Sequence, residues 1–489
     1  MKKDKNIRLF VIYGIGVFIG LFLFLTLINP LGVYDADDWL YIYDLRRPYP
    51  QLHAWNPTRV FPEFFMPIVS YFGALVINPL INNYYFSLTL AHGLFSSVLL
   101  TIYFLQFSVL FYKRKFASAK ASIGYGCLFI LLHFISHIFD GSDNYSFLIS
   151  YNFTVFYFYI LSAVLNATLV MHFMSYGGIK AFFQNSTLIH KIIVIVWAYF
   201  SINSNLFSSV ILATYVGTEL LLNLISEIKE KRFKFKEYCL SNWINLFIII
   251  CWFGANIIET QGGRADSIGK SVISNLPVTF MYGIAGLFVI NIFVTAFVLV
   301  VFVLWRKNRG KLNDTAVRFL VYIGLQLAYL ILLSAASEPQ YAIGTEVVID
   351  SYFFIFMGVI ACLNELVNRV SRKYYRTIII LAGTLVLLFI QPGKLYHAYN
   401  ESNLSYEQLE NIMNDFIDQV KTAEERGEKE MILVVPKYEE AGNWPLSVSL
   451  VGDRIPEALY RHKIIDSRVI VTEVVISEEK NKKFGIELE

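Results

Sequence analysis

The chain has 489 residues, of which 56% are hydrophobic, 16% aromatic and 16% charged, and its mean hydropathy is +0.52. Soluble domains carry about 25% charged residues, so this composition excludes a water-soluble globular enzyme and predicts a chain embedded in lipid. The net charge of +3, from 41 basic and 38 acidic residues, is too balanced for a nucleic-acid-binding protein.

Apolar segments long enough to cross a bilayer recur along the chain. About 20 mostly apolar residues cross the hydrocarbon core as a helix. This length predicts about eleven spans, near residues 8–29, 85–112, 121–139, 146–175, 190–203, 206–226, 240–258, 277–305, 316–336, 347–368 and 376–392. A further apolar stretch, 61–79, contains three prolines and is predicted to form a pair of interfacial helices. The predicted fold class is an all-α polytopic membrane protein.

The basic residues are distributed unevenly between the predicted loops. The first apolar run ends in Asn29-Pro30 without a cleavage site of small residues, which indicates a retained span rather than a signal peptide. With the amino terminus inside, the cytoplasmic segments hold 24 basic residues and the short outer loops hold five. The positive-inside rule therefore predicts a cell-membrane protein with a cytoplasmic amino terminus and an extracytoplasmic carboxy terminus.

The tail differs in character from the rest of the chain. Residues 406–424 have the apolar period of a helix, and residues 431–436 and 469–476 are strand-like runs rich in branched side chains. We therefore predict a transmembrane domain at 1–392 and a small extracytoplasmic α/β domain at 393–489. The tail has no catalytic signature, and a lid or docking module is its favoured interpretation.

The first predicted outer loop, within residues 30–84, carries an acidic cluster. Asp35, Asp37 and Asp38 stand within four residues, directly before Trp39. Carboxylates this close repel one another, so at least one is expected to have a raised pKa or a cationic partner. A carboxyl group with a raised pKa suits a general base that takes a proton from a sugar hydroxyl; a divalent metal or a substrate amine could instead supply the cation. A solvated acidic helix cap is the alternative.

Arginines are scarce in the predicted outer loops, which draws attention to Arg59. It precedes an apolar interfacial segment, and its planar guanidinium matches the oxygens of a phosphate. The alternatives are contact with lipid headgroups or an ion pair with Glu63. Arg264 follows Gly262-Gly263, which permit a tight turn and close approach to a ligand; an ordinary loop ion pair is the alternative there.

The roles of three further groups of polar residues are left open by the sequence. Glu338 lies in a predicted outer loop, and Asp350 lies just inside the next span, where acids are costly and usually functional or paired; both are candidates for sugar binding. His133 and His137 are four residues apart, which places both rings on one helix face and is compatible with a metal. Histidines hydrogen-bonded to neighbouring spans are the favoured interpretation.

These features together resemble the GT-C class of integral-membrane glycosyltransferases. The matching residues are Asp35-Ala36-Asp37-Asp38-Trp39 after the first span, followed by Arg59 at an apolar segment. The chain looks most like the GtrC-like bacterial members that decorate surface or cell-wall polysaccharides. The resemblance covers the span pattern and the first loop, and does not extend to the tail.

The resemblance implies a transferase that uses a polyprenyl-phosphate sugar donor and a polysaccharide acceptor, with inverting attack on the anomeric carbon. The catalytic acid of the family carries over onto Asp37 or Asp38, with Asp38 preferred because it directly precedes the tryptophan. Asp35, Trp39, Arg59, Glu63, Arg264 and Glu338 are the predicted substrate-binding residues. Some members use a divalent metal and others do not, so the metal is left open.

Functions of other classes are compatible with parts of the same pattern. A transporter or flippase for a lipid-linked saccharide would need polar residues through the middle of several spans, whereas here the mid-span regions are mostly aliphatic and aromatic. A ligase that joins a finished polymer to its acceptor would also need outer arginines. A non-catalytic scaffold or sensor would work through its tail.

Overall fold

In the computed structural model of the protein, the described residues are 2–34, 36–134, 137–139, 143–145, 152–263, 271–289, 292–309, 314–369, 405–437 and 452–486. Most of them are helical. Asp35, Arg264 and the predicted span at 376–392 lie outside the described residues.

Seven helices among the described residues are long and apolar enough to cross a membrane. They are Lys5–Ile28, Val60–Ile81, Tyr84–Lys113, Phe153–Tyr176, Leu206–Lys229, Thr315–Ala336 and Pro339–Asn368. All but Val60–Ile81 coincide with predicted spans. The protein is therefore a multi-pass helical membrane protein, in agreement with its composition.

A single helix over Val60–Ile81 takes the place of the predicted pair of helices, and its interfacial position stays a prediction. It is continuous, and consists of α3 (Val60–Phe72), the π-helical turn η2 (Gly73–Ile77) and α4 (Asn78–Ile81). Pro62 lies in its first turn, where a missing N–H removes no intrahelical bond. Gly73 lets the helix approach α5 (Tyr84–Lys113), because a Cβ there would lie 3.0 Å from the Cβ of Ala91. The helix thus continues through Pro67, which lies inside α3, and through Pro79 at the start of α4.

Several other predicted spans are shorter or broken. The shorter or interrupted helices are α6 (Ala119–Phe134), α10 (Leu188–Ile202), α14 (Val272–Ile284) with η5 (Ala285–Val289), and α15 (Ile292–Arg309). Beyond α6 the chain forms an antiparallel pair, β1 (His137–Phe139) and β2 (Asp143–Tyr145); β1 replaces the predicted helical end of the span 121–139, and β2 lies between two predicted spans. In the predicted span 240–258, α12 (Phe235–Ser241) and α13 (Trp243–Glu259) meet at 82°. If that bent pair is one span, the described residues hold eight.

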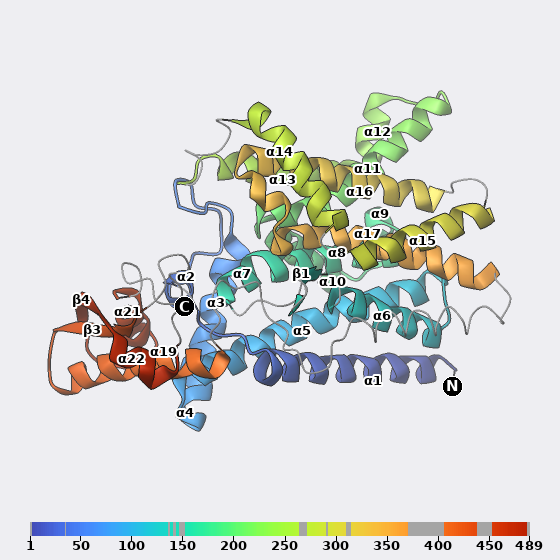
Figure 1. Ribbon diagram of the computed structural model, residues 1–489. Coiled ribbons are helices and arrows are strands. Elements are labelled where there is room, and N and C mark those ends of the chain that lie inside the picture. Colours follow the sequence, from blue (N-terminus) through green and yellow to red (C-terminus); the bar gives the residue numbers. More distant parts are fainter. Residues whose placement is uncertain are drawn as a thin grey trace.

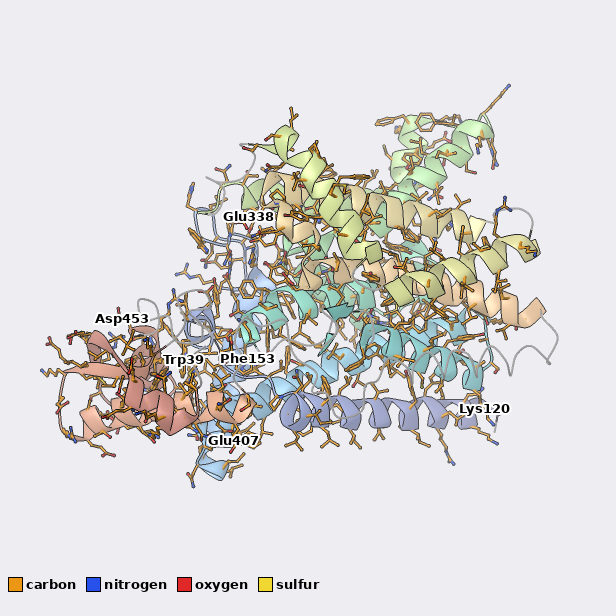
Figure 2. All side chains as sticks on the ribbon, in the orientation of Figure 1. Trp39, Lys120, Phe153, Glu338, Glu407 and Asp453 are labelled. Atoms are coloured by element: carbon orange, nitrogen blue, oxygen red, sulfur yellow. The ribbon has the colours of Figure 1, made fainter. Side chains whose placement is uncertain are left out.

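The remaining helical elements of this part of the described chain complete a bundle whose two ends differ. They are α1 (Lys2–Leu23) with η1 (Phe24–Ile28), α7 (Phe153–Val155) with η3 (Phe156–Leu161) and α8 (Ser162–Tyr176), α9 (Ile179–Asn185), α11 (Leu206–Lys229), α16 (Asp314–Ala336), the 3-10 turn η6 (Pro339–Ala342) and α17 (Thr345–Arg369). Figure 1 shows most of the long helices running side by side, with the amino terminus at one end and the C-terminal elements at the other. In Figure 2, Lys120 lies at the first end, whereas Trp39, Glu338 and Asp453 lie toward the second.

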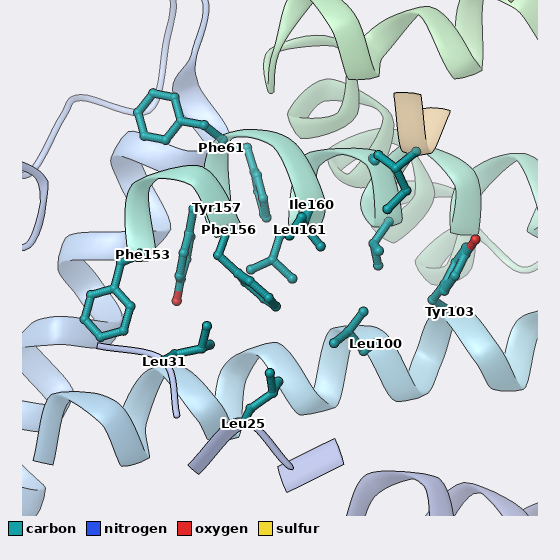
Figure 3. Close-up of a cluster of buried hydrophobic side chains, with 14 of the residues drawn as sticks. Leu25, Leu31, Phe61, Leu100, Tyr103, Phe153, Phe156, Tyr157, Ile160 and Leu161 are labelled. Carbon is teal, nitrogen blue, oxygen red and sulfur yellow. The ribbon is translucent and has the colours of Figure 1, made fainter. Parts of the chain in front are cut away.

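A dense apolar core fixes the second end of the bundle. The buried side chains in Figure 3 come from η1 and the residues after it, α3, α5 and the helix that begins at α7; those labelled are Leu25, Leu31, Phe61, Leu100, Tyr103, Phe153, Phe156, Tyr157, Ile160 and Leu161. Asn152 caps this helix by accepting a hydrogen bond from the Val155 N–H at 2.8 Å. The start of α7 is therefore held rigidly beside the first loop, which contains α2 (Ala36–Tyr41).

Three of the C-terminal elements, one helix and two strands, coincide with those predicted for the tail, whereas the helices over Arg454–Arg461 and Glu478–Phe484 were not predicted. In chain order the C-terminal elements are α19 (Tyr406–Glu425), β3 (Glu430–Pro436), α21 (Arg454–Arg461), β4 (Ile470–Ser477) and α22 (Glu478–Phe484). The strands β3 and β4 pair in parallel, with Glu430 opposite Ile470 at one end and Pro436 opposite Ser477 at the other. A capping box of Ser405 and Gln408 begins α19, and its predicted apolar face is buried.

This C-terminal segment docks on the bundle through polar contacts of buried and half-buried side chains. The Tyr406 hydroxyl lies 2.7 Å from that of Thr89, and Asn83 Nδ2 donates to Glu410 Oε1 at 2.8 Å. His462 is fully buried between the bundle and the first loop. Its Nε2 lies 3.1 Å from the carbonyl oxygen of Ile42, which can only accept, so Nδ1 accepts from the Tyr84 hydroxyl at 2.6 Å.

The docking of α21 is expected to weaken in acid because it requires a neutral His462. Burial lowers the pKa of His462 to about 4, against about 6.5 in an unfolded chain. The folded-state pKa is the lower one, so this contribution to stability is complete above about pH 6.5 and is lost as the pH falls toward 4. We expect hydrogen exchange and protease cleavage in α21 to increase over that interval. A His462→Gln variant, which cannot titrate, should show a flat profile there, and a flat wild-type profile would contradict the prediction.

Candidate functional site

A polar cavity of about 670 Å³ lies between the first loop and the C-terminal segment. Among the described residues, six charged side chains line it, three acidic and three basic: Asp37, Asp44, Glu63, Arg46, Arg47 and Arg454. Tyr41 and the exposed Trp55 add aromatic surface. A cavity with convergent charges and an aromatic wall can hold a charged, hydroxyl-rich ligand.

Of the two members of the acidic triplet that the structure describes, Asp37 is the one that faces this cavity. It lies in the first turn of α2, where a carboxylate is stabilised by the helix dipole, and its side chain is 50% exposed. Arg454 Nη1 donates to Asp37 Oδ1 at 3.0 Å and to the Ala36 carbonyl oxygen at 2.5 Å. The cluster therefore has a cationic partner, as the repulsion argument required, and this partner comes from the tail.

Asp38, one residue further, is fully buried and does not line the cavity. Its Oδ2 accepts from the Tyr34 N–H at 2.8 Å, and its Oδ1 accepts from the N–H and the hydroxyl of Thr154 at 2.7 and 2.6 Å. It thereby joins α2 to the start of α7. The sequence had favoured Asp38 as the general base, whereas this geometry favours Asp37 for contact with a substrate.

Trp39 is also fully buried, and it belongs to the apolar core rather than to the cavity wall. Within the described parts of the chain its indole N–H has no hydrogen-bond partner. The predicted role of Trp39 in substrate binding would require this core to open.

Glu63 pairs with Arg46 and not with Arg59, the partner that the sequence suggested. Arg46 Nη1 donates to Glu63 Oε2 at 2.6 Å, and the guanidinium also contacts the carbonyl oxygens of Asn56 and Pro57. The exposed fractions of the two side chains are only 4% for Arg46 and 11% for Glu63. This buried pair stiffens the loop between α2 and α3 and so supports one wall of the cavity.

Arg59 lies outside the cavity lining. Its guanidinium carbon is 5.2 Å from the ring centroid of Phe158, and that ring packs 5.0 Å from the ring of Tyr41, which does line the cavity. Among the described residues, no carboxylate lies within ion-pair distance of Arg59. The positive charge of Arg59 is therefore available to form an ion pair with an anion next to the cavity.

The end of α13 and the turn that follows it pack against the first loop. Glu259 Oε2 accepts from the Thr58 N–H at 2.8 Å and from its hydroxyl at 2.5 Å. A Cβ on Gly262 would lie 2.5 Å from Pro57, and one on Gly263 would lie 2.6 Å from Trp55. The two glycines thus permit close approach to the first loop, where the sequence had suggested a ligand.

The remaining candidates are not brought to the cavity. Glu338 is exposed and accepts from Gln340 Nε2 at 2.9 Å. Asp350 is buried within α17, and in the described structure its Oδ1 has no hydrogen-bond partner. His133 Nε2 lies 2.9 Å from the Tyr103 hydroxyl and Nδ1 lies 2.7 Å from the Phe129 carbonyl oxygen, which agrees with the hydrogen-bonded interpretation. The side chain of His137 lies outside the described residues.

The described residues contain no group of three or more His, Cys, Asp or Glu side chains placed to hold a metal ion. Comparison of the chain with protein-family models, curated proteins and solved structures gives no match. The function must therefore be inferred from the residues of the cavity.

Sequence reasoning missed Arg454 and Arg46 as parts of the site. Arg454 is one of the twelve basic residues beyond position 392, and no local pattern connects it to Asp37, 417 positions earlier. Arg46 was counted as an outer-loop arginine, but its burial depends on contacts with Asn56 and Glu63 that only the folded loop creates.

Proposed function

We propose that the protein is a membrane glycosyltransferase of the GT-C type. It moves a sugar from a polyprenyl-phosphate donor to a cell-surface or cell-wall polysaccharide, on the extracytoplasmic side of the membrane. The observation that carries this proposal is the half-exposed Asp37 carboxylate in a cavity that also holds arginines and aromatic side chains. The positive-inside asymmetry supports an extracytoplasmic position for this end of the bundle.

The setting of the cavity suits a substrate with a polar head and a lipid tail. The helix Val60–Ile81 follows directly on the cavity-lining loop, and it exposes apolar side chains along its length: Ile68, Phe72, Leu75, Val76 and Leu80. A polyprenyl chain could lie along this exposed surface while its phosphate and sugar occupy the cavity. A soluble nucleotide sugar would gain nothing from such an apolar face.

In the proposed reaction, Asp37 accepts the proton of an acceptor hydroxyl. The hydroxyl oxygen forms a bond to the anomeric carbon from the face opposite the phosphate, and the carbon–oxygen bond to the phosphate breaks. The bonding electrons leave with the lipid phosphate, whose charge nearby arginine side chains stabilise. Trp55 and Tyr41 offer rings on which a sugar can stack.

A transporter or flippase for lipid-linked saccharides is the alternative. The observation in its favour is Asp350, a buried acid within a membrane helix with an oxygen that has no hydrogen-bond partner among the described residues. A ligase for lipid-linked saccharides shares the cavity chemistry and differs in the size of the unit transferred.

The test is transfer by the purified protein in detergent. We expect it to move labelled hexose from a synthetic polyprenyl-phosphate hexose to a surface polysaccharide, with release of one lipid phosphate for each sugar transferred. A cell that lacks the protein should lose one sugar substituent from its surface glycan. If the protein transfers no sugar but moves the intact lipid-linked saccharide across the membrane of proteoliposomes, the flippase function replaces the transferase function.

A further inference from the structure

We infer that Arg454, in the C-terminal segment, binds the phosphate of a lipid-phosphate ligand in the cavity, so that the site is incomplete without this segment. The inference rests on the proposed function and extends it, because it assigns the tail a part in substrate recognition. Sequence interpretation had favoured a lid or docking module for the tail.

The hydrogen bonds of Arg454 leave one edge of its guanidinium available. Both of its protein contacts, to Asp37 and to the Ala36 carbonyl oxygen, use Nη1. In the described structure Nη2 and Nε have no partner, and the side chain is 24% exposed in the cavity wall. A guanidinium presents five donors in a plane, so this edge can form a fork on two phosphate oxygens while Nη1 holds Asp37.

Arg454 is also held in place before any ligand arrives. It begins α21, whose Ile455, Pro456, Ala458 and Leu459 are buried. The same helix leads into His462, which is fixed between Tyr84 and the Ile42 carbonyl oxygen. A cation positioned by a packed helix binds an anion with little loss of side-chain entropy.

The other arginines near the cavity are less suited to this contact. Arg46 is buried and committed to Glu63 and two carbonyl oxygens. Arg59 lies over Phe158, outside the cavity lining. Arg47 lines the cavity but is exposed, and it donates to the Tyr49 hydroxyl at 3.0 Å. Arg454 alone among these arginines combines a place in the wall, a fixed backbone and an ion pair to the proposed base.

This arrangement couples the phosphate to Asp37. Among the residues that the structure describes, Asp37 is the one carboxylate paired with this guanidinium. A phosphate on the open edge competes with Asp37 for the same cation, because the two anions repel each other across it. Removal of the Asp37 charge should therefore tighten phosphate binding, whereas removal of the Arg454 charge should weaken it.

The experiment measures binding of farnesyl phosphate to the purified full-length protein in a neutral detergent, with farnesol and inorganic phosphate as parallel ligands. We expect Arg454→Ala to raise the dissociation constant for farnesyl phosphate about tenfold or more, Arg454→Lys to raise it less, and Asp37→Asn to lower it. Farnesol binding should not change in any variant. Inorganic phosphate should bind far more weakly than farnesyl phosphate, because it lacks the lipid chain.

Arg461→Ala is the matched control, because Arg461 ends the same helix, is half exposed and pairs with Glu457 at 2.7 Å. Protease cleavage of α21 shows in each variant whether the segment is still docked. If Arg454→Ala binds farnesyl phosphate as tightly as the wild type, or if Arg461→Ala loses as much affinity, the inference is overturned while the transferase proposal stands. If the wild type binds farnesol and farnesyl phosphate equally, the phosphate-bearing donor itself is excluded.

Discussion

An Asp37→Asn variant is expected to fold normally and to transfer sugar about 10²- to 10⁴-fold more slowly than the wild type, the range that a general base contributes. The amide has nearly the same shape as the carboxylate but cannot accept the proton of the acceptor hydroxyl. The side chain is half exposed, so the substitution leaves no buried charge without a partner. The loss should appear in kcat and not in a weaker affinity for the donor.

The measurement compares initial rates at saturating donor with the unfolding temperature of the same preparation. Asp453→Asn is a suitable control, because this exposed residue directly precedes Arg454 and makes no side-chain cap to α21. Full activity of Asp37→Asn would remove the base from the mechanism. A large fall in unfolding temperature would instead mean that Asp37 acts through the fold.

Asp38→Asn is expected to destabilise the protein by on the order of 2 kcal/mol, although it changes the shape of the side chain little. Each carboxylate oxygen of Asp38 accepts a hydrogen bond from a backbone N–H, that of Tyr34 on one side and that of Thr154 on the other. An asparagine amide has only one acceptor oxygen. Its NH₂ group must therefore face one of these two backbone N–H groups, and two donors cannot form a hydrogen bond with each other. The residue is fully buried, and water cannot satisfy the group left unpaired.

The apparent unfolding temperature in detergent tests this prediction, with Asp37→Asn as the matched control one residue away. Asp38→Asn should melt at a clearly lower temperature, and hydrogen exchange should rise at the start of α7, where Thr154 lies. Equal unfolding temperatures for the two variants would contradict the structural role. If Asp38→Asn lost sugar-transfer activity while its unfolding temperature stayed unchanged, Asp38 would instead have a catalytic role.

The opposite positions of Asp37 and Asp38 show the limit of the sequence argument. Consecutive residues on a helix point about 100° apart, so one of two neighbouring acids can face the core while the other faces the cavity. The phase of α2 follows from packing, since Trp39 and Ile42 are buried on the side of Asp38. A helix of six residues has too few turns for its apolar pattern to reveal that phase.

The sequence by itself determined that the protein crosses a membrane several times, because length and hydropathy are properties of local segments. It also identified α19 and both strands of the tail, but not α21 or α22, and it directed attention to the acidic first loop. It divided the continuous helix over Val60–Ile81 into two helices, because the three prolines in this stretch indicated a break.

The tertiary structure decided the composition of the cavity. Arg454 forms an ion pair with Asp37, which lies 417 positions earlier in the chain. Glu63 pairs with Arg46 instead of Arg59, and Asp38 is buried in the interior. Such pairings depend on the docking of α21 and on the course of the first loop, which are set by the packing of many distant side chains together. Composition and local periodicity do not predict such long-range contacts. Only the folded chain therefore shows which charged side chains line the same cavity.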